Sequence, residues 1–120
     1  MKILYVEDHP AQSQVVAQTL ELSGHDVALA ETGEEGIEKT YTWRPDVILM
    51  DLRMPGIGGI EAIRQIKSDP VVADIPIIVI SAWSDEKNQE RALEAGAVKV
   101  LTKPVGIARL LDQINEVVSS

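Results

Sequence analysis

The sequence predicts an α/β fold in which a parallel sheet lies between two layers of helices, a three-layer αβα sandwich. Short apolar runs rich in branched residues alternate with longer segments of helical period, and the middle runs are continuously apolar, as strands covered on both faces are. Strict alternation of strand and helix implies parallel pairing through right-handed crossovers. With 120 residues, the chain is expected to form one domain, residues 1–120.

Five apolar runs have the length of a strand, and helical segments separate them. The runs are Ile3–Val6, Val27–Ala30, Val47–Met50, Ile75–Ile80 and Val98–Leu101. The helical period is clearest near the C-terminus, where one stripe contains Ile107, Leu110, Leu111, Ile114, Val117 and Val118. In the middle of the chain, isoleucine recurs at every third position as Ile60, Ile63 and Ile66.

Residues that begin or end helices lie at the junctions. Pro10 suits the first turn of a helix, and Thr32 followed by Glu35 is typical of a capping box. Gly24 and Gly96 lie where the first and fourth helices should end. The chain therefore divides into five strand–helix units.

Composition excludes several classes of function. The chain has 19 acidic and 11 basic residues, a net charge of −8 and a pI of about 4.6, so its average field repels nucleic acid and anionic lipid. Cysteine is absent, which excludes disulfides, zinc–thiolate sites and cysteine nucleophiles. No apolar stretch approaches the ~18 residues of a membrane span, and the N-terminal run is too short for a signal peptide. We expect a cytoplasmic protein that binds neither DNA directly nor a membrane.

Chemically active side chains follow the predicted strands. In open parallel sheets the functional crevice lies at the carboxyl ends of the strands, and the residues there are Glu7, Asp8, Asp51, Ser81 and Lys103. A single acidic residue at such a place is most often a solvated helix cap. Three carboxylates that converge repel one another, so keeping them ionised requires a cation, and hard oxygen ligands suit Mg²⁺ or Mn²⁺.

A carboxylate beside such a metal can act as a nucleophile toward phosphorus. It forms an acyl phosphate while the metal and a lysine neutralise the equatorial oxygens. Asp51, Lys103 and the Ser81 hydroxyl fit these roles.

Four motifs in order resemble the receiver domains of bacterial two-component response regulators, including the chemotaxis regulator. They are residues 3–8 (ILYVED), 47–56 (VILMDLRMPG) with Gly59, 77–82 (IIVISA), and Ala95-Gly96-Ala97 leading to Thr102-Lys103-Pro104. The resemblance covers the whole chain. It implies a doubly wound, flavodoxin-like sheet of strand order 2-1-3-4-5, an order for which the chemotaxis regulator is a standard example.

The resemblance also implies a role for each matching residue. Asp51 matches the phosphoacceptor, Asp8 the direct metal ligand, and Glu7 the acidic neighbour that acts through metal-bound water. Arg53 matches the position whose backbone carbonyl completes the metal shell.

Two further positions match residues that contact the phosphoryl group. Ser81 matches the Ser/Thr that hydrogen-bonds a phosphoryl oxygen, and Lys103 the lysine that pairs with the group. The Lys103-Pro104 bond resembles the family's cis peptide, and residues 54–59 resemble the mobile loop beside the acceptor.

Two positions depart from the family pattern, and three further residues have roles that the resemblance does not assign. Val100 replaces the usual aromatic switch, and Val105 replaces a frequent Phe. His9 is expected to cap a helix or contact a partner, because Mg²⁺ takes oxygen ligands. Trp83 is expected on the loop at the rim of the crevice, as a lid or a docking aromatic, and Trp43 in peripheral packing.

Other classes with the same alternation fit less well. An FMN-binding flavodoxin needs phosphate-binding amides after the first strand, where Glu7-Asp8 would repel phosphate. A haloacid-dehalogenase-type phosphatase needs a second Asp at the position of Arg53. A pseudo-receiver, which binds partners without phosphorylation, remains the alternative, although such chains typically lose an acid, the acceptor or the lysine, and none of these is lost here.

We therefore expect a phosphorylation-activated switch, either free-standing or part of a longer protein. It would accept a phosphoryl group from a histidine kinase or histidine phosphotransfer protein and catalyse only its own phosphorylation and dephosphorylation. The partner is expected to contact the loop after Pro104 and the first helix through Pro10, Gln12, Ser13 and Val16.

Overall fold

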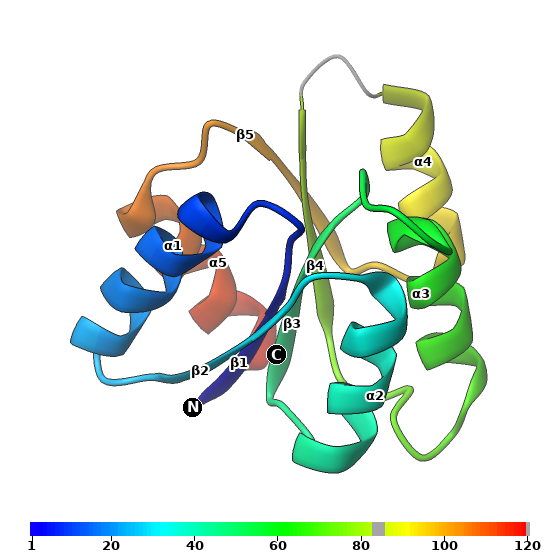
Figure 1. Cartoon of the computed structure of the whole chain (residues 1–120), viewed down its shortest axis with the longest axis horizontal. Helices are drawn as coiled ribbons and strands as arrows, with labels where there is room; N and C mark the ends of the chain where they lie inside the picture. Colours follow the sequence, from blue (N-terminus) through cyan, green and yellow to red (C-terminus); the bar gives the residue numbers. More distant parts are fainter. Residues whose placement is uncertain (83–85, 120) are drawn as a thin grey trace.

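The computed structural model describes residues 1–82 and 86–119. Five strands alternate with five helices in this part of the chain (Figure 1). The elements are β1 (Lys2–Val6), α1 (Pro10–Leu22), β2 (Asp26–Ala30), α2 (Gly33–Trp43), β3 (Val47–Asp51), α3 (Gly58–Ser68), β4 (Ile77–Ala82), α4 (Glu86–Ala95), β5 (Lys99–Lys103) and α5 (Ile107–Val118). None of these helices is long and apolar enough to cross a lipid bilayer.

The strands form one parallel sheet of order β2-β1-β3-β4-β5, which confirms the predicted fold class. β1 lies between β2 and β3, with Val6 level with both Ala30 and Met50. Asp51, the last residue of β3, is level with Ile80 of β4. The strand order reverses beside β1 and β3, so the residues that follow these two strands lie where ligands bind in sheets of this kind.

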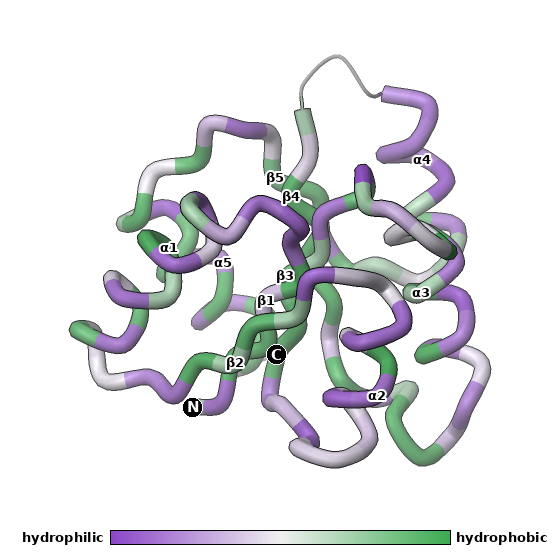
Figure 2. The backbone as a smooth tube through the Cα atoms, viewed as in Figure 1, coloured by the Kyte–Doolittle hydropathy of each residue, from purple (hydrophilic) through white to green (hydrophobic). Residues whose placement is uncertain are grey.

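Helices cover both faces of the sheet, and each face has its own apolar cluster. Figure 1 shows α1 and α5 on one side of the sheet and α2, α3 and α4 on the other. Side chains alternate along the strands: Leu4 and Val6 join the cluster under α2, α3 and α4, whereas Ile3 and Tyr5 join the cluster under α1 and α5. Figure 2 shows the apolar strands between helices with hydrophilic stretches. All five residues of β3 are buried, as a continuously apolar central strand predicts.

Each strand differs from its predicted run by one or two residues at one or both ends, and β4 and β5 differ most. β4 begins at Ile77 instead of Ile75, because the Ile75 amide donates to the Val72 carbonyl in a turn at 3.1 Å. β5 begins at Lys99 instead of Val98 and continues to Lys103, where it pairs with Ala82. The apolar pattern ends at Leu101, but the backbone pairing continues through two polar residues.

The predicted helix boundaries are confirmed at three places and corrected at one. Pro10 lies in the first turn of α1, and Gly24 (φ 92°) and Gly96 (φ 123°) follow the ends of α1 and α4 in the left-handed region. Thr32 caps α2 by accepting from the Glu35 amide at 3.1 Å. The Glu35 carboxylate, however, accepts from the amide of residue 31 and not from that of Thr32, so the capping box is shifted by one residue.

Gly59 fixes the distance between α3 and the end of β3. Its amide donates to the Leu52 carbonyl at 3.2 Å. A Cβ atom at this position would lie 2.4 Å from the Asp51 carbonyl oxygen and 2.8 Å from the Leu52 Cα, both of them backbone atoms that cannot rotate away. The helix can therefore approach the strand that carries Asp51 only with glycine here.

Gly59→Ala is expected to destabilise the fold by about 2 to 3 kcal/mol, the cost of forcing extra volume into a packed site. The control is Gly106→Ala, because a Cβ there meets no atom within 4 Å and its φ of −68° suits alanine. The control should change stability by less than about 1 kcal/mol. Urea denaturation measures both, and equal stability of the two variants would contradict the close approach.

Candidate functional site

Charged side chains from three strands meet at the carboxyl edge of the sheet. Glu7 and Asp8 directly follow β1, Asp51 ends β3, and Lys103 ends β5. Glu7 is fully buried although it is ionisable, and Asp51 is 5% exposed. Buried carboxylates need hydrogen-bond or charge partners. The partners of Glu7 and Asp51 define the site.

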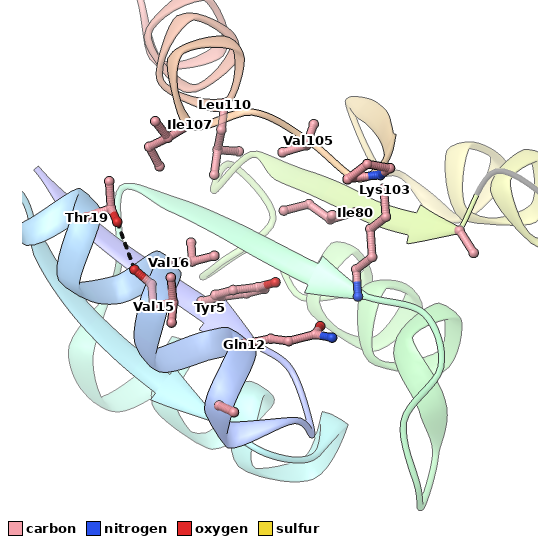
Figure 3. A pocket seen from close by; sticks show the side chains of 13 residues that line it. Tyr5, Gln12, Val15, Val16, Thr19, Ile80, Lys103, Val105, Ile107 and Leu110 are labelled. Carbon is pink, nitrogen blue, oxygen red and sulfur yellow. Dashed lines mark hydrogen bonds between the residues drawn. The ribbon is translucent and has the colours of Figure 1, made fainter.

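Lys103 bridges the two buried carboxylates. Its Nζ lies 2.7 Å from Asp51 Oδ2, where it donates a hydrogen bond, and 3.5 Å from Glu7 Oε1. Figure 3 shows the Lys103 side chain running from β5 to the carboxyl end of β3. The backbone amide of Arg53 donates to the other oxygen of Asp51, Oδ1, at 2.8 Å. Both oxygens of Asp51 therefore accept a hydrogen bond.

The two carboxyl groups have opposite pKa shifts. Burial, together with the neighbouring Asp51 carboxylate, raises the pKa of Glu7 to about 7. Burial alone would also raise the pKa of Asp51, but the neighbouring Glu7 and the hydrogen bonds from Lys103 and the Arg53 amide hold it below its usual value. Lys103, although also partly buried, has a raised pKa because Asp51 and Glu7 favour its charged form. In the absence of metal, Asp51 is thus ionised near neutral pH while Glu7 keeps its proton longer.

Two carboxylate oxygens beside this pair have no hydrogen-bond partner. They are Glu7 Oε2 and Asp8 Oδ1, both buried. Unsatisfied, negatively polarised oxygens are costly in a protein interior. A hard divalent cation would satisfy them, so the residues present fit a Mg²⁺ site.

His9 lies closer to this acidic pair than the sequence indicated. Its Nδ1 is 3.1 Å from Glu7 Oε1 and 3.0 Å from Asp8 Oδ1. One ligand atom each from Glu7, Asp8 and His9 lie within 4.8 Å of one another. His9 occupies the N-cap position of α1 but makes no capping hydrogen bond with its side chain.

Ser81 is buried at 2% exposure near the end of β4. Its hydroxyl donates to the neighbouring Ala82 carbonyl at 3.5 Å, a long and weak hydrogen bond. A hydroxyl held this weakly can turn to another acceptor at little cost.

Glu34, in the first turn of α2, is a contact that sequence reasoning missed. Its Oε1 accepts from the Ile57 amide at 3.2 Å, and a Cβ on Gly56 would lie 2.6 Å from its carboxylate. It therefore holds the loop that follows β3 and carries Arg53. Nothing in the sequence separates Glu34 from other acidic residues in first helical turns.

An apolar groove of about 750 Å³ opens beside the site, between α1 and the segment from β5 to α5 (Figure 3). Gln12 and Val16 line it from α1, and Pro104 and Val105 from the opposite side. These residues include part of the expected partner surface. Ser13 is an error in that expectation, because it is 3% exposed and its hydroxyl donates to the Pro10 carbonyl.

The sequence points to four further features: Val100, Trp43, the Lys103-Pro104 bond and Trp83. Val100 is partly buried against the cluster under α2, α3 and α4. Trp43 packs against the same cluster, with Lys2 Nζ 5.4 Å from the centre of its ring, which confirms peripheral packing. The Lys103-Pro104 bond is cis, as expected. Trp83 lies outside the described residues.

Comparisons with known proteins agree with this arrangement. Residues 3–115 match the family described as response regulator receiver domain. The chain is 37% identical over 118 residues to Protein PilH of Pseudomonas aeruginosa, covering 98% of each chain. It is 35% identical to the phosphate regulon transcriptional regulatory protein PhoB of the same organism, of which it spans only 50%.

Solved structures show the same fold. The receiver domain of a sensor histidine kinase from Pseudomonas aeruginosa, solved with a magnesium ion coordinated in the active site cleft, superposes with a TM-score of 0.91 at 32% identity, covering 99% of this chain and 98% of that one. A putative response regulator from Chloroflexus aurantiacus gives a TM-score of 0.94 at 26% identity, covering 99% and 98%.

The raised pKa of Glu7 predicts a pH dependence of stability in metal-free protein. The folded chain keeps this proton up to about pH 7, whereas an unfolded glutamate releases it near 4.5. The folded state therefore binds more protons in this window, and stability falls as pH rises through it, by on the order of 3 kcal/mol.

Glu7→Gln is expected to remove that fall, because an amide does not titrate. Urea denaturation in a metal chelator, at several pH values between these limits, measures the slope for both proteins. The same slope in wild type and variant would show that Glu7 does not hold the proton.

Proposed function

Because the chain belongs to the response regulator receiver domains of two-component systems, we propose that it is a phosphorylation-activated switch with Asp51 as the phosphoacceptor. The phosphoryl donor is a phosphohistidine of a sensor kinase or phosphotransfer protein. The observation that carries this proposal is the Asp51 carboxylate at the end of β3, which accepts hydrogen bonds from Lys103 and from the Arg53 amide.

The proposed transfer is an in-line displacement at phosphorus. A carboxylate oxygen of Asp51 forms the new oxygen–phosphorus bond, while the nitrogen–phosphorus bond of the donor histidine breaks and its electron pair stays on the imidazole. Lys103 passes from Asp51 to the incoming phosphoryl oxygens. The Ser81 hydroxyl, free of strong hydrogen bonds, turns to donate to another phosphoryl oxygen. The same residues support slow hydrolysis, so the domain modifies only itself.

The metal requirement is part of the proposal. Asp8, Glu7, Asp51 and the backbone carbonyl of Arg53 would hold Mg²⁺ or Mn²⁺, the first two through oxygens that lack a partner. A bound divalent ion supplies neutralising charge for the phosphoryl oxygens. The magnesium-bound sensor-kinase receiver among the similar structures supports this assignment.

The groove beside α1 is the proposed docking place for the donor. It adjoins Lys103, so a helix seated there would hold its histidine near Asp51. Gln12, Val16 and Pro104 are the expected contacts, with the exposed Pro10 at the edge.

Asp51→Asn is expected to abolish labelling by acetyl phosphate with Mg²⁺, because the amide is not a nucleophile. Asp112→Asn, an exposed position on α5, should label like wild type. Intact-mass spectrometry of freshly treated protein measures the acyl phosphate. Labelled Asp51→Asn would refute the acceptor, and an unlabelled wild type would favour a pseudo-receiver that only binds partners.

Mg²⁺ is expected to raise the melting temperature, because it binds the folded acidic pair and not the unfolded chain. At about ten times its Kd the ion adds ~1.4 kcal/mol of stability. Asp8→Ala should remove most of the shift, and Asp112→Ala should keep it. Thermal denaturation with and without Mg²⁺ measures this, and a full shift in Asp8→Ala would place the ion elsewhere.

A further inference from the structure

The ring of His9 is directed at the acidic pair and not at the helix that it precedes. Its Nδ1 forms a hydrogen bond with Glu7 Oε1 at 3.1 Å and lies 3.0 Å from Asp8 Oδ1. The side chain of His9 is 64% exposed, whereas that of Glu7 is 0% exposed. The imidazole therefore lies on the solvent side of buried carboxylate oxygens.

Two observations separate this cluster from an ordinary group of surface acids. Glu7 is completely buried, yet its Oε2 has no hydrogen-bond partner. Asp8 Oδ1 is also without one, although His9 Nδ1 is 3.0 Å away, because the geometry is not that of a hydrogen bond. Ligand atoms at such spacings suit one cation, because two ligands at right angles, each about 2.1 Å from the ion, lie about 3.0 Å apart.

We propose that His9 is a third metal ligand and that the Glu7–Asp8–His9 cluster binds a borderline transition ion, such as Co²⁺, Ni²⁺ or Zn²⁺, in preference to Mg²⁺. An imidazole nitrogen binds these ions well, whereas Mg²⁺ takes oxygen ligands and keeps its waters. Two carboxylates and one imidazole also form a donor set that leaves positions open for water.

The inference rests on the acidic pair that the proposed function uses, but it requires neither phosphorylation nor Asp51. Both oxygens of Asp51 are occupied by Lys103 and the Arg53 amide, so the three-residue cluster can hold an ion without displacing those contacts. A transition ion would then compete with Mg²⁺ for the same carboxylates. Which metal ion occupies the acidic pair would then regulate this receiver, because a bound transition ion keeps Mg²⁺ out.

The test measures Co²⁺ and Mg²⁺ binding directly, with metal-free wild type and His9→Ala. Equilibrium dialysis gives the affinities at a pH above the ordinary imidazole pKa. We expect His9→Ala to weaken Co²⁺ binding at least tenfold and Mg²⁺ binding less than twofold. In wild type, proton NMR should show imidazole ring signals shifted far outside the normal range by paramagnetic Co²⁺, and His9→Ala should lack them.

His25 supplies the matched control, because its Nδ1 lies 3.3 Å from the N-terminal amine and could form a competing site. His25→Ala should keep both affinities and the shifted signals. Unchanged Co²⁺ binding in His9→Ala, an equal loss of both ions there, or loss of Co²⁺ in His25→Ala would each overturn the proposal while leaving the phosphoacceptor assignment intact. If wild type bound neither ion, the metal site of the proposed function would fail as well.

Discussion

The site depends on one lysine held between two buried carboxylates. Glu7 and Asp51 lie at the ends of adjacent strands, and two negative charges this close and this buried would oppose folding. Lys103 offsets the repulsion, because its ammonium is 2.7 Å from Asp51 Oδ2 and 3.5 Å from Glu7 Oε1. The proton that Glu7 retains removes more of it. Lys103 and this proton thus limit the repulsion between the carboxyl groups, and two oxygens still lack a hydrogen-bond partner and can bind a cation.

Much of the fold and of the site can be predicted from the sequence, because the alternation of apolar strands with helical segments determines both. Apolar runs mark the strands, and the first polar residues after them, such as Asp8 and Asp51, must lie at one edge of a parallel sheet. Strand limits were less predictable: β5 runs on to Lys103 because backbone pairing does not require apolar side chains.

Contacts that depend on where a side chain points in the folded structure could not be predicted from the sequence. His9 follows Asp8 directly, but its place in the sequence does not specify that its ring lies beside the two acids. Glu34 is close to Ile57 only through the packing of α2 against the loop after β3. The burial of Ser13 depends on which face of α1 meets the sheet, and the weak hydrophobic periodicity of that helix left this open.

We infer that Lys103 keeps Asp51 ionised and ready to accept a phosphoryl group. Carbon-13 NMR titration of the side-chain carboxyl groups, in metal-free wild type and in Lys103→Met, tests it directly. We expect Asp51 in wild type to titrate below the usual range for aspartate, and we expect removal of the ammonium to raise its pKa. If Asp51 titrated at or above the usual value in wild type, or identically in both proteins, Lys103 would not be what keeps it ionised.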